Sequence, residues 1–205
     1  MKAWIIWGLA IFLYGAFFVW YQGLRRPLTK DEIDTVLESL GRAENASPER
    51  LARFRAFLEA DDGREFFMVN LIRMNTEKVE DPDSGEPVDP NALLLRYTRP
   101  FMRRVLRRAG HPVFFGQAAG GYLEEWGVSE DPGWTTAAVV RYRSRRDLVE
   151  LVSDPSFPLV HRYKLAAIAG TFAFPAAPAM LFVGPRVWVG LLLALLAVAA
   201  HRVFG

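Results

Sequence analysis

The segment Phe66-Phe-Met-Val-Asn-Leu-Ile72 (FFMVNLI, residues 66–72) is the stretch on which the fold of this chain depends. Its aromatic and branched residues follow one another without a helical period, which is typical of a buried strand. Asp61-Asp62-Gly63, just before it, has the composition of a turn. We therefore expect a buried strand at 66–72, entered from a turn.

Two amphipathic helices are predicted upstream of this strand. Thr29 and Glu32 have the spacing of a capping box, and apolar residues follow at helical spacing over 33–40. Ser47-Pro48 supplies an N-cap and a first-turn proline for a second helix, whose apolar stripe covers 51–58. Residues 25–62 are thus expected to form a helical lead-in to the strand.

Downstream of the strand, turn residues divide the chain into further elements. We expect a loop at 81–87, a helix at 91–108 with Leu94, Phe101, Met102 and Val105 facing inward, strand segments at 113–117, 122–126 and 134–142, helices at 145–152 and 158–167, and a last strand at 171–174. If 113–126 is one interrupted strand, the order is βαββαβ. The sequence therefore predicts an α+β fold of the ferredoxin-like type over 63–175.

In a ferredoxin-like domain the helices cover one face of a four-stranded antiparallel sheet. The other face is bare in a monomer, and an exposed apolar face of this size usually finds a partner. We therefore expect a homodimer that packs sheet on sheet.

Both ends of the chain are long apolar segments. AWIIWGLAIFLYGAFFVWYQGL (3–24) has no charged residue and is long enough to cross a bilayer core of about 30 Å. A cleaved signal peptide is the alternative, but the apolar run is long for one and no A-x-A site follows it. We expect residues 1–24 to be a retained transmembrane helix.

The C-terminal segment VWVGLLLALLAVAA (187–200) is apolar on every face. A helix that packs on a water-soluble domain is the alternative, but such a helix would carry a polar stripe. Pro185 suits a first helical turn, and Arg186 can then lie among lipid headgroups. We expect residues 185–205 to form a second transmembrane helix.

Charge is distributed unevenly along the 205 residues. All 23 acidic residues lie between Asp31 and Asp154, a region with 17 basic residues and a net charge of −6, whereas each end carries +4. This pattern favours membrane lipids over nucleic acid as partners. More of the flanking basic residues lie on the domain side of the two spans. The positive-inside rule therefore predicts a two-pass protein of the inner (plasma) membrane with a cytoplasmic domain.

Several short motifs together carry a resemblance to a known family. They are FFMVNLIRM (66–74), YTRPFM (97–102), AGHPVFFG (109–116), W-x5-VRYRSR (134–145) and LVSDPSF followed by HR (151–162). In this order they resemble the dimeric α/β-barrel family known as domain of unknown function number 1330. The resemblance covers about residues 63–174 and implies a ferredoxin-like dimer without implying an activity. The terminal membrane helices depart from the usual soluble form of that family.

Candidate site residues are few. His161 could face a pocket with Asn70 and Arg73, and the alternative is a hydrogen-bonded structural histidine. Asn70 could orient a ligand or hold a neighbouring loop. Tyr97 and Trp134 could line a cleft between sheet and helices, or belong to an aromatic core.

The spacing of the three histidines indicates no metal site, and we expect no cofactor. The sequence thus predicts a membrane-anchored dimeric α/β-barrel module of unknown activity, with a small molecule as a candidate ligand. The alternative is an enzyme of the monooxygenase or isomerase type, which rests on analogy of fold.

Overall fold

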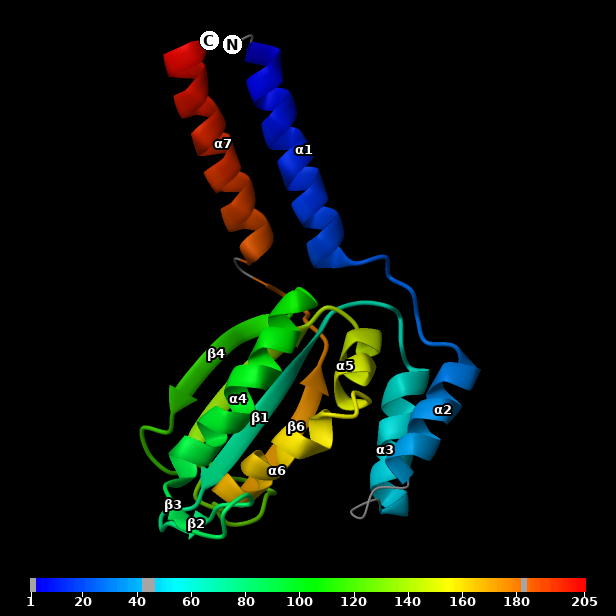
Figure 1. The fold of residues 1–205 in the computed structure, drawn as a ribbon, viewed down its shortest axis with the longest axis vertical. Coiled ribbons are helices and arrows are strands. Elements are labelled where there is room, and N and C mark those ends of the chain that lie inside the picture. The colour runs from blue at the N-terminus through cyan, green and yellow to red at the C-terminus, as the bar shows by residue number, and fades with distance from the viewer. Residues whose placement is uncertain (1–2, 42–46, 182–183) are drawn as a thin grey trace. The chain divides into compact units, whose positions relative to one another are not determined.

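The computed structural model describes residues 3–41, 47–181 and 184–205 (Figure 1). The chain forms two compact units, one made of residues 1–24 with 178–205 and the other of residues 25–177. The helical lead-in and the sheet therefore belong to the same unit.

The first unit consists of two helices, α1 (Ala3–Gln22) and α7 (Pro185–Phe204). Both helices are long and apolar enough to cross a membrane, and only 6% of the apolar window of each is buried. The two pack against each other, with the Arg186 guanidinium 5.3 Å from the centre of the Tyr21 ring. Gly190 allows α7 to approach α1 closely, since an added Cβ at this position would lie 3.2 Å from Cε2 of Tyr14.

The second unit has an α+β architecture. Its elements are α2 (Lys30–Gly41), α3 (Pro48–Glu59), β1 (Phe66–Met74), β2 (Val79–Glu80), β3 (Pro87–Val88), α4 (Pro90–Arg107), β4 (His111–Gln117), β5 (Thr136–Tyr142), α5 (Arg145–Val152), α6 (Phe157–Ala167) and β6 (Ile168–Ala176). The expected strand at 66–72 is confirmed as the core of β1.

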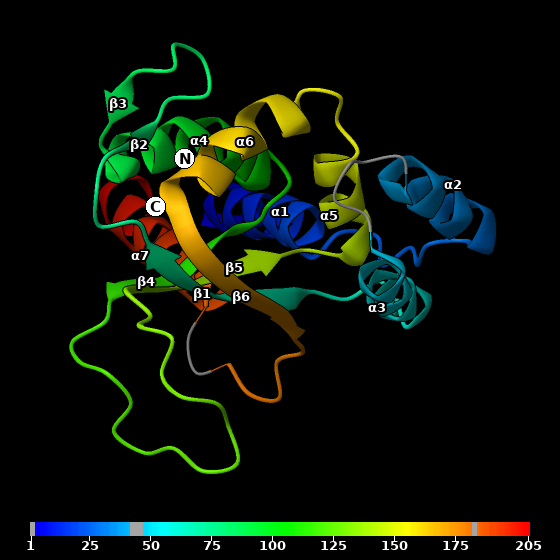
Figure 2. The same ribbon diagram turned by 90° about the horizontal axis from the view of Figure 1, so that it is seen from below.

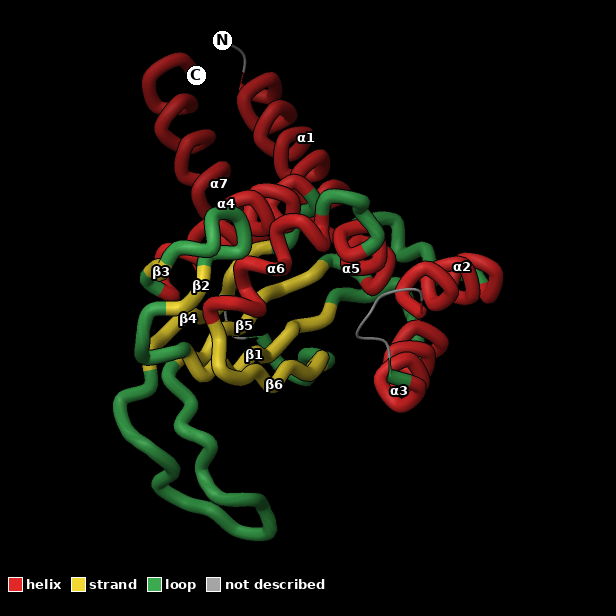
Figure 3. Tube along the Cα trace, turned by 60° about the horizontal axis from the view of Figure 1, so that its bottom comes forward, coloured by secondary structure: helices red, strands yellow, loops and turns green. Residues whose placement is uncertain are grey.

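Four strands form one antiparallel sheet in the order β4-β5-β1-β6. Helices α4 and α6 lie together over one face of this sheet, as Figures 2 and 3 show. The strand β1 is central, and its residue Val69 pairs with Val139 of β5 and with Phe174 of β6. Side chains alternate along a strand, so this register fixes which residues of β1 face the helices.

The core between the sheet and the helices is built from apolar residues of β1, α4, β5 and α5. Phe66 and Tyr142 stack with ring centres 5.1 Å apart, and Met68 packs against the same cluster. Even-numbered residues of β1 up to Ile72 therefore face the helices. Odd-numbered residues of β1 face the opposite side of the sheet.

The predicted helix caps of the second unit are observed. The Thr29 amide donates to a carboxylate oxygen of Glu32 at 2.8 Å, and the Glu32 amide donates to the Thr29 hydroxyl at 3.3 Å. Ser47 caps α3 by accepting from the Arg50 amide. These caps satisfy backbone donors that a helix N-terminus otherwise leaves unpaired.

The strand expected at 122–126 is not observed, because these residues lie in a loop over 118–135. The backbone amide of Tyr122 donates to the Asp131 side chain rather than to a neighbouring strand. A strand needs a partner edge, and β4 ends at Gln117 before this segment begins. The interrupted strand 113–126 is therefore a strand that ends at 117.

The inward face of α4 also differs by one residue from the prediction. Leu93 is fully buried, and Leu94 is only half-buried. The helix begins at Pro90 with Asp89 as its N-cap, whose side chain accepts from the Asn91 amide.

The expected loop at 81–87 connects the short strands β2 and β3. Asp81 is buried in it and accepts a hydrogen bond from Arg96 of α4 at 2.7 Å. The Asp83 carboxylate accepts from the Tyr163 hydroxyl of α6 at 2.7 Å. These carboxylates attach the turn to both helices.

Candidate functional site

The strongest candidate site lies between α4 and α6. The ring of Tyr97 stacks on Phe101 at 5.1 Å and meets the ring of His161 edge-on at 5.8 Å. His161 stacks in turn on Phe157 at 4.9 Å, and the Lys164 ammonium lies 5.9 Å from the centre of the Tyr97 ring. We call Tyr97, His161 and Lys164 with their two phenylalanine neighbours the α4–α6 cluster.

Burial governs the ionisation of this cluster. Burial lowers the pKa of His161 to about 4, with further lowering by the positive charges of Lys164 and Arg50. Burial also lowers the pKa of Lys164 and raises the pKa of the Tyr97 hydroxyl above its usual range. At neutral pH the site therefore has a neutral imidazole and a protonated phenol, beside a Lys164 amine that burial removes from much of its hydration.

The polar atoms of the α4–α6 cluster keep their hydrogen-bonding capacity. Among the described residues, the Tyr97 hydroxyl, the His161 imidazole and the Lys164 ammonium make no hydrogen bond or ion pair with another protein group. Partly buried polar groups are normally paired with protein or water. Donors from three side chains beside aromatic rings suit a small molecule with a carboxylate or carbonyl group.

Asn70 and Arg73 do not complete this site as a pair. Three residues apart on one strand, they point to opposite faces of the sheet, so at most one can face α6. The Asn70 amide donates to the carbonyls of Met68 at 3.0 Å and Ala138 at 3.4 Å. These contacts give Asn70 a structural role within β1 and β5, rather than at the neighbouring loop that was the structural alternative.

Arg73 lies on the face of the sheet opposite α4 and α6. It donates to the carbonyls of Pro132 at 3.0 Å and Ala169 at 3.4 Å. Its guanidinium therefore fastens the base of the 118–135 loop to β6.

Trp134 belongs to the same loop. Its indole donates to the Tyr122 hydroxyl at 3.1 Å. Of the five candidates from the sequence, the structure thus joins Tyr97 to His161, leaves Asn70 within the sheet, and places Arg73 and Trp134 at the base of the 118–135 loop. Lys164 is the member of the cluster that the sequence reasoning missed, although its position three residues after His161 on one helix was a usable signal.

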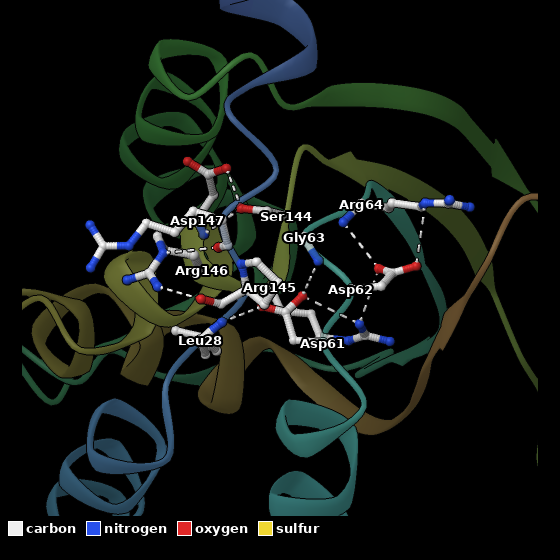
Figure 4. A network of polar contacts seen from close by, with 11 residues as sticks. Leu28, Asp61, Asp62, Gly63, Arg64, Ser144, Arg145, Arg146 and Asp147 are labelled. Carbon is white, nitrogen blue, oxygen red and sulfur yellow. Dashed lines mark hydrogen bonds and ion pairs between the residues drawn. The ribbon is translucent and has the colours of Figure 1, made fainter.

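A second polar constellation, which the sequence reasoning also missed, centres on Asp61 (Figure 4). Its side chain is 1% exposed and accepts from the Leu28 amide at 2.9 Å and the Gly63 amide at 3.0 Å. Arg145 pairs with the same carboxylate at 3.3 Å and lies over the ring of Phe57. These contacts hold the start of the lead-in against the start of α5.

Arg146 extends this network. It donates to the carbonyls of Arg26 and Pro27 and to both carboxylate oxygens of Glu32. Ser144 caps α5 by accepting from the Asp147 amide. These contacts join the lead-in to α5, and we assign this network to structure.

One more buried charge is structural. Arg141 is 1% exposed and donates to Glu65 at 2.5 Å and to the carbonyl of Ala109 at 2.6 Å. Both contacts satisfy the guanidinium within the protein. As for metals, no group of three His, Asp or Glu residues that could hold an ion occurs within 3–41, 47–181 and 184–205.

Comparisons with known proteins bear on the fold alone. No family model and no curated protein matches this chain. Among solved structures it is similar to the RPA0582 protein of unknown function from Rhodopseudomonas palustris, with 23% identity, a TM-score of 0.53, and coverage of 67% of this chain and 97% of that one. The methylated RPA0582 protein is similar at 22% identity and a TM-score of 0.53, with coverage of 69% and 98%.

Proposed function

We propose that this protein is a membrane-anchored, ferredoxin-like dimeric module that binds a small carboxylate- or carbonyl-bearing molecule at the α4–α6 cluster. The observation that carries the ligand proposal is the set of unpaired polar groups of Tyr97, His161 and Lys164 beside aromatic rings. The anchor and the dimer are supported by other observations.

The exposure of α1 and α7 supports the membrane anchor. A core helix of a water-soluble protein is mostly buried, whereas only 6% of each apolar window is buried here. Lipid would cover the exposed apolar residues of both helices, including Trp4 and Leu195. The basic residues that flank both segments on the domain side support a cytoplasmic domain at the inner membrane.

The strand order supports the ferredoxin-like dimer. Order β4-β5-β1-β6 with helices between β1 and β4 and between β5 and β6 fits a βαββαβ chain. The face opposite α4 and α6 carries exposed Phe114, Phe172 and Phe174. A second copy on that face would remove them from water, as in the family of unknown function number 1330 that the motifs resemble.

An enzyme of the isomerase type is the second candidate. Burial lowers the pKa of His161 and makes it a weak base, but its imidazole is neutral at pH 7 and has a ring nitrogen that could accept a proton from a bound carbonyl compound. Lys164, 5.9 Å from the Tyr97 ring, could stabilise the resulting negative charge. Exchange of a substrate proton for deuterium by the wild-type protein, lost in His161→Phe, would favour this candidate.

The binding proposal is tested with the full chain in detergent. Native mass spectrometry would look for a retained small molecule, and titration calorimetry would measure binding of benzoate as an aromatic carboxylate probe. We expect Lys164→Met and His161→Phe to weaken benzoate binding at least tenfold. Arg99→Gln is the matched control, since it removes an exposed cation from α4 outside the cluster.

Unchanged benzoate affinity in Lys164→Met and His161→Phe, together with the absence of a retained molecule in the wild type, would contradict the proposal. A fall in melting temperature without a change in binding would assign His161 to structure instead.

A further inference from the structure

The loop between β4 and β5 presents an apolar tip to solvent. We call residues 118–135 the arm. Leu123 is 101% exposed, Trp126 94% and Val128 66%. Large apolar side chains this exposed on one loop commonly mark an interaction site.

Hydrogen bonds close the base of the arm. Asp131 accepts from the backbone amides of Tyr122 at 2.9 Å and Gly133 at 2.8 Å. The Trp134 indole donates to the Tyr122 hydroxyl, and Arg73 donates to the Pro132 carbonyl. The tip at 123–130 is thus presented from a fixed base.

The arm leaves the sheet on the side away from α4 and α6, as Figures 2 and 3 agree. That side of the sheet is the apolar face, where Phe114, Val139, Val69 and Phe174 share one row across the four strands. Phe172 follows in the next row, with its ring 5.9 Å from that of Phe174. The arm and the apolar face are therefore available to the same partner.

We propose that the arm of one copy of this chain packs on the apolar sheet face of a second copy. The inference rests on the proposed dimer and deepens it, because it assigns the residues that hold the two copies together. The contact places Leu123 and Trp126 of each copy against Phe114, Phe172 and Phe174 of the other.

The available area favours this arrangement over contact between the sheets alone. The phenylalanines at 114, 172 and 174 are 54%, 55% and 42% exposed. At roughly 200 Å² for a fully exposed ring, they offer about 300 Å². A stable interface needs about 800 Å² from each partner. Trp126 alone adds about 200 Å², and Leu123 and Val128 add to this, so the arm brings the area close to that of a stable dimer.

The arm is also long enough. An extended chain from 118 to 126 reaches at most about 30 Å. The nine-residue strand β6 has about the same length. The tip can therefore lie along the rows of phenylalanines on a facing sheet.

Charge on the arm favours a second copy over a lipid surface. The arm has the acidic residues Glu124, Glu125, Glu130 and Asp131 and no lysine or arginine. An anionic inner leaflet would repel these carboxylates, because its lipids attract basic segments instead. Insertion of Trp126 into lipid is accordingly the competing outcome that the experiment must separate.

The absence of cysteine from the chain permits a specific test. Two differently tagged full-length chains, one with Trp126→Cys and the other with Phe172→Cys, would be co-purified in nanodiscs and oxidised. We expect a disulfide between the two chains. Leu106→Cys, at an exposed apolar residue of α4, replaces Phe172→Cys as the matched control and should give no cross-link with Trp126→Cys.

A second measurement gives the strength of the contact. Wild-type chain should be dimeric by native mass spectrometry in detergent, and the double variant Leu123→Ser, Trp126→Ser should raise the dimer dissociation constant at least tenfold. The matched control Leu95→Ser, Leu106→Ser should leave it unchanged.

The outcomes separate the inference from the proposed dimer. If the wild-type chain is a dimer but no cross-link forms, and the arm variant does not weaken the dimer, the inference is wrong and the proposed dimer is retained. A monomeric wild-type chain overturns both. A dye on Trp126→Cys that nitroxide lipids quench would place the arm in the bilayer, and this also overturns the inference.

Discussion

Arg146 holds both carboxylate oxygens of Glu32, with Nη1 2.7 Å from Oε1 and Nη2 2.8 Å from Oε2, across 114 residues of sequence. The same guanidinium donates to the carbonyls of Arg26 and Pro27. The start of the lead-in is therefore attached to the start of α5 by one side chain, which acts as a two-pronged donor.

Loss of this attachment should destabilise the domain. We expect Arg146→Ala to lower the free energy of unfolding of the full chain by about 1–2 kcal/mol, because charged hydrogen bonds are lost. Chemical denaturation followed by tryptophan fluorescence would measure it. Arg103→Ala on α4, which has no ion pair among the described residues, is the control and should change stability by less than about 0.5 kcal/mol. Equal effects of the two variants would contradict the role of Arg146.

The ion pair between Arg146 and Glu32 should make the stability of the folded chain depend on pH in the acid range. Hydrogen bonds from Arg146 and then from the Thr29 amide lower the pKa of Glu32 from 4.5 to about 2. The carboxylate therefore contributes stability above pH 4.5, and this contribution is lost as the pH falls from 4.5 toward 2. Melting temperatures of wild type and Glu32→Gln, measured across this window, should converge at the acid end. Parallel curves would argue against the coupling.

His161 should produce a pH effect in a different window. Burial lowers its pKa to about 4 in the folded chain against 6.5 in the unfolded chain. Between pH 6.5 and pH 4 the unfolded chain therefore binds more protons than the folded chain. The contribution of neutral His161 to the free energy of unfolding is complete above pH 6.5 and is lost as the pH falls toward 4. We expect the free energy of unfolding to fall by on the order of 2 kcal/mol across this pH window.

The matched variant is His161→Phe, which keeps an aromatic ring beside Phe157 but cannot titrate. Unfolding free energies at pH 7.5 and pH 4.5 should differ less in this variant than in the wild type. A difference as large as in the wild type would show that other groups cause the pH dependence.

Two glycines allow a matched test of backbone approach. Gly63 has φ of +69°, and an added Cβ would lie 2.6 Å from the carbonyl carbon of Arg25. Gly85 has φ of +76°, but its nearest atom would be a side-chain oxygen of Glu80 at 3.9 Å. We expect Gly85→Ala to cost about 1 kcal/mol from backbone strain alone. Gly63→Ala should cost clearly more, because the lead-in must move; thermal denaturation of both variants would decide.

The flanking basic residues predict the orientation in the membrane. A reporter that is active only in the periplasm, fused after Pro87, should be silent in cells. The same reporter fused after Phe204 should be active, because the single span α7 lies between the domain and the C-terminal end. Strong activity at Pro87 would reverse the orientation.

The sequence alone determined most of the local structure. Three local signals were sufficient to predict α2, α7 and β1, because each depends on residues a few positions apart. They are the capping pair Thr29–Glu32, the first-turn proline at 185 and the mostly apolar run at 66–72. It was insufficient at 122–126, where aromatic composition predicted a strand that has no partner edge.

Only the tertiary structure decided which distant side chains meet. Packing of α4 against α6 joined Tyr97 to His161 and brought Lys164 beside them. The ion pair between Arg146 and Glu32 and the exposure of Trp126 on the arm likewise cannot be predicted from residues nearby in the sequence. The opposite faces of Asn70 and Arg73, by contrast, follow from their spacing of three residues on one strand. The physical reason is that periodicity and caps act within a few residues, while contacts and burial depend on how whole elements pack.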